Sequence, residues 1–163
     1  MNQLGEVKVG IADLNIVLAP DVIMTIGLGS CVGIALYDGI KKIAGLSHIM
    51  LPDSTQFKNV KNEMKFADSA VPLLLKKMEL KGCRKQNIVA KIAGGASMFN
   101  FSDKSIISDI GKRNGEAVKK ALEKENIRII GEELGGNKGR TMILDSNSGR
   151  VTLNVVGQGT IEL

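Results

Sequence analysis

The sequence predicts an α+β fold in which packed, mixed β-sheets are flanked by two main helices. Runs rich in Val and Ile dominate the first third of the 163-residue chain and have the length and composition of β-strands. Two later segments carry apolar residues at intervals of three and four, which is the repeat of an amphipathic helix. The order strands, helix, strand, helix, strands favours an α+β sandwich over a doubly wound sheet.

The expected strands are short, and glycines mark most of the points where one apolar run gives way to the next. No repeat, low-complexity tract or linker interrupts them, so residues 1–163 are expected to form a single domain. The expected strands span residues 7–11, 22–26, 32–36, 43–49, 88–93, 127–131, 141–144 and 151–156.

The first expected helix covers residues 63–80. Pro72 lies within it, and a proline removes a backbone donor and clashes one turn back. The helix therefore either kinks at this proline or begins near it, with Asp68 or Ser69 as its N-cap. Gly82 is expected to end the helix, because glycine readily adopts the left-handed conformation found there.

The second expected helix covers residues 108–125 and has a lysine-rich outer face. Asn114, in the segment IGKRN, is expected on a face of this helix, where its side chain can bond a loop backbone rather than act in catalysis. The residues expected to face inward are Ile110, Ala117, Val118, Ala121 and Leu122.

Composition restricts the classes of partner and the compartment. The net charge of +5 favours an anionic partner, but aromatic residues make up only 3% and no zinc-finger or basic-zipper spacing is present, so nucleic-acid binding is not expected. Two cysteines cannot form a disulfide framework, and the N-terminal residues lack the features of a signal peptide. No apolar stretch approaches the roughly 18 residues that span a bilayer. The sequence therefore predicts a cytoplasmic protein without membrane insertion.

The segment TIGLGSCVGIALYD, residues 25–38, brings one cysteine to the start of a strand through a glycine-rich turn. Acyl transfer needs a nucleophile that substrate can approach and backbone N–H groups that hold the oxyanion. Cys31 is the candidate nucleophile, and the backbone of Gly29 and Ser30 is the candidate oxyanion site. The alternative is that Cys31 is a small core residue, since unpaired cysteine is among the most buried residue types.

His48 is the only histidine and lies in GLSHIMLP at the end of an expected strand. A neighbouring imidazole is the usual means of deprotonating a thiol at neutral pH. A turn at Asp38 and Gly39 would pair the two strands and bring His48 and Cys31 to the same end of a sheet. Alternatively, His48 is only a polar residue that caps a strand. Thr25 offers a hydroxyl that orients the imidazole, although strand threonines are more often simple β-formers.

Six segments resemble, in the right order, the CheD family of bacterial chemoreceptor glutamine deamidases: GLGSCVGIALYD, GLSHIMLP, KFADSAVPLLLKKM, AKIAGGASMF, IGKRN and GGNKGR. The resemblance implies that Cys31 attacks the glutamine carboxamide, that His48 serves as base and then acid, and that Thr25 completes the triad. It also implies a fold similar to the cytotoxic necrotising factor deamidase toxins. The implied substrate is the cytoplasmic helices of chemoreceptors, and a CheC-type phosphatase is an implied partner. No cofactor and no metal are required.

Other interpretations remain open at this level. A non-catalytic adaptor would use the same surface to bind receptor helices or the phosphatase, with Cys31 incidental. A redox switch between Cys31 and Cys83 is disfavoured, because KGCRKQ is typical of a loop after a helix and no CxxC motif is present. Nucleotide binding is not expected, since GGNKGR lacks the Gly-Lys-Ser/Thr of a phosphate loop. The segment after residue 93 either lines a substrate groove or forms a tight turn, and its residues in question are Gly94, Gly95, Ser97, Met98 and Phe99.

Overall fold

The computed structural model describes residues 4–97 and 109–163, which form two five-stranded sheets and two main helices. The helices are α1 (Ala67–Leu80) and α2 (Ile110–Lys124), with short 3-10 turns η1 (Ser54–Gln56), η2 (Glu63–Lys65) and η3 (Lys85–Asn87). The strands are β1 (Glu6–Val9), β2 (Asp13–Leu18), β3 (Val22–Leu28), β4 (Val32–Asp38), β5 (Ile43–Ile49), β6 (Ile88–Gly94), β7 (Arg128–Leu134), β8 (Arg140–Asp145), β9 (Val151–Val155) and β10 (Gly159–Glu162).

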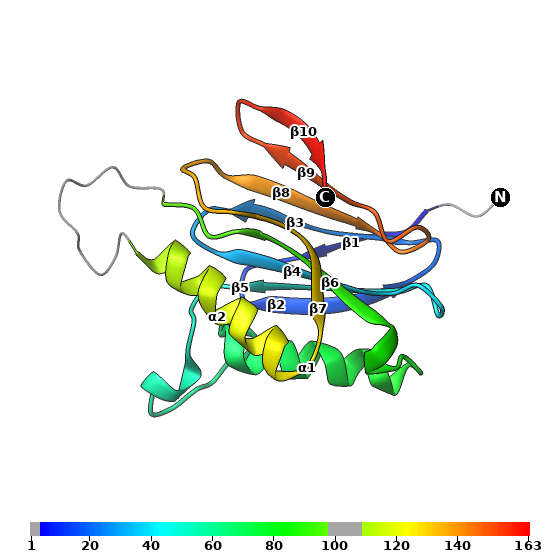
Figure 1. Ribbon diagram of the computed structural model, residues 1–163, viewed down its shortest axis with the longest axis horizontal. Helices are drawn as coiled ribbons and strands as arrows, with labels where there is room; N and C mark the ends of the chain where they lie inside the picture. Colours follow the sequence, from blue (N-terminus) through cyan, green and yellow to red (C-terminus); the bar gives the residue numbers. More distant parts are fainter. Residues whose placement is uncertain (1–3, 98–108) are drawn as a thin grey trace.

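Both sheets are mixed, which confirms the predicted α+β class with mixed sheets and two helices. The first sheet has the order β1-β3-β8-β9-β10 and the second has the order β2-β5-β4-β6-β7. In each sheet one pair is parallel, β1 with β3 and β6 with β7, and the remaining pairs are antiparallel. Figure 1 shows both helices on one side of the strands and the β8–β10 ribbon on the opposite side.

The molecule has three layers: the helices, the second sheet and the first sheet. Strand β5 belongs to the second sheet, which is the middle layer, and its two faces contact the two outer layers. Ile43 and Ile49 pack with the helices, whereas Ala44 and Leu46 pack against the first sheet. Because successive side chains of a strand point to opposite faces, His48 shares the face of Ala44 and Leu46. The histidine therefore lies between the two sheets.

Two strands were not predicted, and local composition explains both. Strand β2 contains Asp13 and Asn15, residue types that are depleted in strands, yet it forms a six-residue ladder with β5. Strand β10 is exposed along its whole length, so it carries no apolar pattern. The first strand also ends at Val9 rather than Ile11, because the chain turns at Ala12, whose φ is 58°.

Helix α1 contains Pro72 and begins after Phe66, which has no side-chain capping bond. The predicted caps are therefore wrong. The carboxylate of Asp68 accepts hydrogen bonds from the backbone and hydroxyl of the η1 turn, and the hydroxyl of Ser69 donates to a carbonyl of η2. These contacts with the segment that precedes the helix occupy the groups that would otherwise cap it. Gly82 ends the helix as predicted, with a φ of 98°.

Helix α2 is confirmed, and most of its predicted buried face is correct: Val118 and Leu122 are fully buried, with Ala117 and Ala121 packed beside them. Ile110, also predicted to face inward, is only half-buried and is not part of the core. Asn114 is also fully buried on this face, an unusual position for an amide side chain. The predicted start at Ser108 lies outside the described residues. In the parts of the chain that the structure describes, neither helix is long and apolar enough to cross a membrane.

Candidate active site

The two sheets bring Thr25 and His48 together in the molecular interior. Thr25 lies on β3 of the first sheet and His48 on β5 of the second, and neither side chain is exposed to solvent. The Oγ1 of Thr25 is 2.7 Å from the Nδ1 of His48, and the same hydroxyl donates a 2.7 Å hydrogen bond to the carbonyl of Val9. The hydroxyl of Thr25 on β3 thus links the imidazole on β5 to the backbone of β1.

This pair of hydrogen bonds determines the tautomer of His48. A hydroxyl has a single proton, and a carbonyl can only accept, so the proton of Thr25 goes to Val9. The oxygen of Thr25 must then accept from Nδ1, which therefore carries the imidazole proton. The lone pair of the neutral ring is consequently on Nε2, as a general base requires.

Burial keeps the imidazole of His48 neutral. Desolvation lowers its pKa from the usual 6.5 to about 4, because the charged form loses its hydration between the sheets. Nε2 is buried and has no hydrogen-bond partner among the described residues. The Nε2 atom of the neutral ring can therefore accept a proton, and no described residue donates a hydrogen bond to it.

Cys31 lies immediately before β4, the strand that pairs with the strand of His48. In the β4–β5 ladder Gly33 is paired with His48, and Cys31, two residues earlier, is on the same face. The half-buried side chain of Cys31 packs against the core between the sheets. The hairpin predicted at Asp38 and Gly39 is therefore confirmed, although the thiol does not hydrogen-bond Nε2.

The thiol of Cys31 is uncharged in this environment. Burial raises its pKa, and a hydrogen bond from its own backbone N–H offsets part of that effect. His48 is also neutral, so the two residues do not form a thiolate–imidazolium ion pair in this structure.

The turn that carries Cys31, residues 27–31, is fixed through three successive carbonyl groups. The carbonyl of Gly29 accepts from the N–H of Ala96 at 2.8 Å, and that of Cys31 accepts from the N–H of Gly95 at 2.8 Å. The carbonyl of Ser30 accepts from the side-chain amide of Asn114 at 2.9 Å. The turn is therefore anchored on one side by the β6–α2 connection and by α2 itself.

The N–H groups of the same turn differ in their availability. The N–H of Gly29 donates to the carbonyl of Gly27 at 3.1 Å, within the turn. No other described residue accepts a hydrogen bond from the N–H of Ser30 or of Cys31. The N–H of Ser30 therefore remains for an acceptor that approaches the thiol, whereas the N–H of Cys31 interacts with its own sulfur.

Gly94, the last residue of β6, packs against this turn, and Gly95 follows it. A Cβ at Gly94 would lie 2.2 Å from the carbonyl oxygen of Cys31, and one at Gly95 would lie 2.7 Å from that of Gly111. Both glycines have positive φ, 118° and 62°. Glycine is required at each position because backbone meets backbone there. Of the other residues considered in this segment, Met98 and Phe99 lie outside the described residues.

Comparison with known proteins identifies the family. A family model described as CheD chemotactic sensory transduction matches residues 50–155. The chain belongs to the CheD family. A protein of Clostridium botulinum (strain Eklund 17B / Type B), named probable chemoreceptor glutamine deamidase CheD, is 73% identical over 158 residues, which covers 97% of this chain and 98% of that protein. Its counterpart in strain Hall (Type A) is 64% identical over the same coverage.

A solved structure provides only a distant likeness to this CheD-family chain. The Bacillus licheniformis hypothetical protein YfiH aligns with a TM-score of 0.43 and 14% identity, covering 74% of this chain and 49% of that one. A likeness at this level carries no argument about the site, which therefore rests on the geometry described above.

The second cysteine of this CheD-family chain lies far from the first. Cys83 follows α1, is 5% exposed, and hydrogen-bonds Asp38 at the last residue of β4. Cys31 precedes the first residue of that strand, and seven residues of strand extend about 20 Å. A disulfide requires Cα atoms within about 7 Å, so a Cys31–Cys83 switch is excluded. Burial, together with the nearby carboxylate of Asp38, raises the pKa of Cys83 to about 11.

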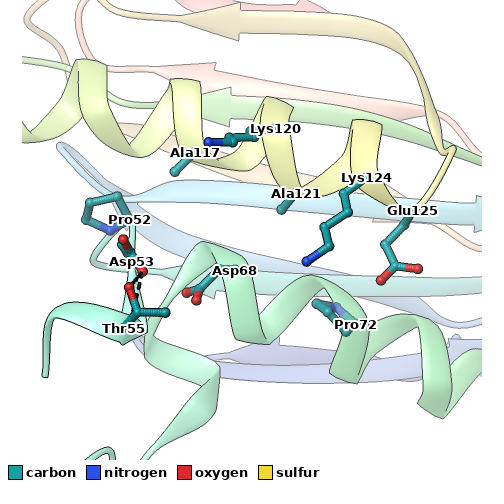
Figure 2. Close-up of a pocket in the computed structure, with 10 residues that line it drawn as sticks. All are labelled: Pro52, Asp53, Thr55, Asp68, Pro72, Ala117, Lys120, Ala121, Lys124 and Glu125. Atoms are coloured by element: carbon teal, nitrogen blue, oxygen red, sulfur yellow. Dashed lines mark hydrogen bonds between the residues drawn. The ribbon is translucent and has the colours of Figure 1, made fainter. Parts of the chain in front are cut away.

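A groove of about 390 Å³ between α1 and α2 contains none of the candidate catalytic residues (Figure 2). Its carboxylates already have structural partners. Asp53 bonds Thr55, Asp68 bonds the η1 turn, and Glu125 pairs with Lys85. The carboxylates of the groove therefore serve the fold, and two lysines, Lys120 and Lys124, also line it.

Proposed function

We propose that this chain is a chemoreceptor glutamine deamidase, an amidohydrolase that converts glutamine side chains of methyl-accepting chemotaxis receptors to glutamate with release of ammonia. Membership of the CheD family supports the reaction and the substrate. The structural observation that carries the proposal is the buried Thr25–His48 pair, whose tautomer leaves Nε2 free on the face that Cys31 shares.

In the proposed mechanism, the Sγ of Cys31 attacks the carboxamide carbon while Nε2 of His48 accepts the thiol proton. The oxyanion is held by backbone N–H groups of the turn, with Ser30 and Cys31 as donors, and Gly29 supports the turn through its own bond to Gly27. The imidazolium then protonates the departing nitrogen, and ammonia leaves a thioester. A water molecule activated by His48 hydrolyses the thioester to glutamate and restores the thiol.

The neutral state of both groups supports proton transfer that is coupled to attack. Burial disfavours both charged forms, the thiolate of Cys31 and the imidazolium of His48. Neither charged form is therefore expected in the absence of substrate. A developing oxyanion beside two backbone donors compensates for the charge on the imidazole. A resting site of this kind also limits indiscriminate reaction of the thiol with other electrophiles, since the thiolate is the reactive form.

A purely adaptor function is the alternative that the same surface allows. An adaptor has no need for a histidine that is buried in a fixed tautomer with an unused lone pair, because leaving a buried polar atom unpaired is unfavourable. Incubation of the protein with a purified receptor cytoplasmic fragment, followed by peptide mass spectrometry, distinguishes the two. Deamidation adds about one dalton to specific glutamine peptides. A receptor fragment that binds but keeps its mass would support the adaptor and contradict the enzyme.

A smaller effect is expected for Thr25. Thr25→Val removes the hydroxyl that sets the tautomer and leaves the carbonyl of Val9 without its donor. We expect kcat to fall about tenfold, since groups that only orient an imidazole contribute less than the base itself. Thr25→Ser, which retains the hydroxyl, is the matched control and should keep most of the activity. Equal activity in both variants, measured as ammonia release, would contradict the orienting function.

We further propose that a CheC-type phosphatase binds over the active site and competes with the receptor. A deamidase that acts on a protein must leave its thiol open to a macromolecular surface, and Cys31 is half-buried rather than enclosed. Cys31 should therefore react with iodoacetamide faster than Cys83, and either partner should slow that reaction. Alkylation followed by peptide mapping measures both rates. A phosphatase that binds without protecting Cys31 must dock elsewhere.

Three broader features belong to the same proposal. Residues 1–163 form one domain, a view supported by the second sheet, which packs against the helices on one face and the first sheet on the other. The fold resembles that of cytotoxic necrotising factor deamidases, which superposition of the two sheets would test. The reaction takes place in the cytoplasm, where the two free cysteines stay reduced.

A further inference from the structure

Asn114 makes two hydrogen bonds that join separate parts of the site. It lies on α2, is 0% exposed, and its Nδ2 donates at 2.9 Å to the carbonyl of Ser30 and at 2.9 Å to the carbonyl of Met50. Both acceptors are carbonyl groups, so the side chain must present its NH₂ end to them. The orientation of the amide is thus set by chemistry.

The rest of the Asn114 amide has no partner. Its Oδ1 is buried and accepts no hydrogen bond from any described residue. An unpaired buried acceptor is unfavourable, and an apolar side chain at this helix position would avoid it. The presence of asparagine at this position is therefore best explained by the two hydrogen bonds that its Nδ2 donates.

The bond to Ser30 controls the direction of the next N–H. The carbonyl of Ser30 and the N–H of Cys31 belong to one planar trans peptide, so they point in opposite directions. With the carbonyl held toward α2, the N–H of Cys31 is turned away from the helix, and its interaction with the Cys31 thiol lowers the pKa of that thiol in opposition to burial. The side chain of Asn114 therefore orients the N–H that lies closest to the reacting sulfur.

The bond to Met50 secures the other half of the site. The β4–β5 ladder begins at the pair Val32 and Ile49. Met50 therefore lies just beyond the end of the ladder, where backbone pairing no longer holds the two strands together. His48 is two residues before Met50, and Ser30 is the residue before Cys31. One side chain thus ties the turn of the nucleophile to the end of the strand that carries the base.

We propose that Asn114 is a positioning residue for deamidation, which fixes the Cys31 amide as an oxyanion donor and holds Cys31 in register with His48. This inference rests on the proposed function for its catalytic meaning. It assigns no contact with substrate to Asn114, which acts only through the carbonyl groups of Ser30 and Met50.

The test compares Asn114→Ala with Val118→Ala, a control that trims a fully buried residue one turn along the same helix and touches neither carbonyl. For Asn114→Ala we expect kcat per folded molecule to fall tenfold to a hundredfold with KM within about threefold, since an interaction made mainly in the transition state is lost. Val118→Ala should lower the melting temperature but leave kcat unchanged. Asn114→Ser, which retains one donor, should fall between wild type and alanine.

A second readout does not depend on activity. Release of the Cys31 amide removes its hydrogen bond to the thiol, so the pH midpoint of Cys31 alkylation should rise in Asn114→Ala and not in Val118→Ala. If the wild type releases no ammonia but the alkylation midpoint still shifts, the deamidase proposal fails and the positioning function stands. An active wild type with unchanged kcat and midpoint in Asn114→Ala overturns the positioning function alone. Failure of both Asn114 variants to fold also overturns it, because the residue would then serve the fold.

Discussion

Replacement of Cys31 by alanine is expected to abolish ammonia release from receptor fragments, with a fall of at least about a thousandfold. The thiol of Cys31 is the proposed nucleophile, and without it no thioester forms. The substitution removes one half-buried sulfur at the end of a turn whose three carbonyl anchors are backbone groups. The fold should therefore remain, which circular dichroism and the thermal unfolding midpoint would check.

The matched control is Cys83→Ala. Cys83 is more buried than Cys31 and lies at the opposite end of β4, where burial and Asp38 keep its thiol protonated. The variant should retain wild-type kcat, with a loss of stability of roughly 1 kcal/mol from the small cavity. A folded Cys31→Ala protein that deamidates at the wild-type rate would remove the proposed mechanism. Loss of activity in Cys83→Ala alone would point to a function of that thiol.

The local parts of the site could be predicted from the sequence. Cys31 immediately precedes β4 and His48 lies on β5, and a short hairpin that joins these two strands has few ways to pair them. The pairing of the two strands therefore follows from strand assignment and the turn at Asp38. The α+β class followed in the same way from the order of apolar runs, because each run reports its own secondary structure.

The long-range parts of the site could not be predicted in the same way. Thr25 reaches His48 across the space between two sheets, and no local pattern shows which faces of two sheets meet. Asn114 is 84 and 64 residues from its two acceptors, and both acceptors are backbone carbonyls, which every residue possesses. The sequence therefore indicated that Asn114 would bond a loop, but not which loop. The signal was its polar side chain on an otherwise apolar helix face.

The second large effect is expected for His48. His48→Gln places a polar side chain without a titratable nitrogen on β5, and we expect kcat to fall by about 10²–10⁴, the usual contribution of a general base. The chain has no other histidine to replace it. In the wild type, kcat/KM should stay level as the pH is lowered to about 5 and decline only toward pH 4, because the imidazole must be neutral to accept the thiol proton. A decline centred near pH 6.5 would contradict a buried base.

The same substitution should change how stability depends on pH. The unfolded chain protonates His48 near pH 6.5, whereas the folded chain does so only near pH 4, so between these values the unfolded state binds more protons. The stability linked to His48 is therefore complete above about pH 6.5 and is lost as the pH falls toward 4. The interval of about 2.5 pH units corresponds to about 3 kcal/mol. Urea unfolding at pH 7 and pH 4.5 should show a larger drop in the wild type than in His48→Gln, since acidic groups contribute equally to both. An equal drop in the two proteins would mean that the folded imidazole protonates near its ordinary pKa and that His48 is hydrated rather than held between the sheets.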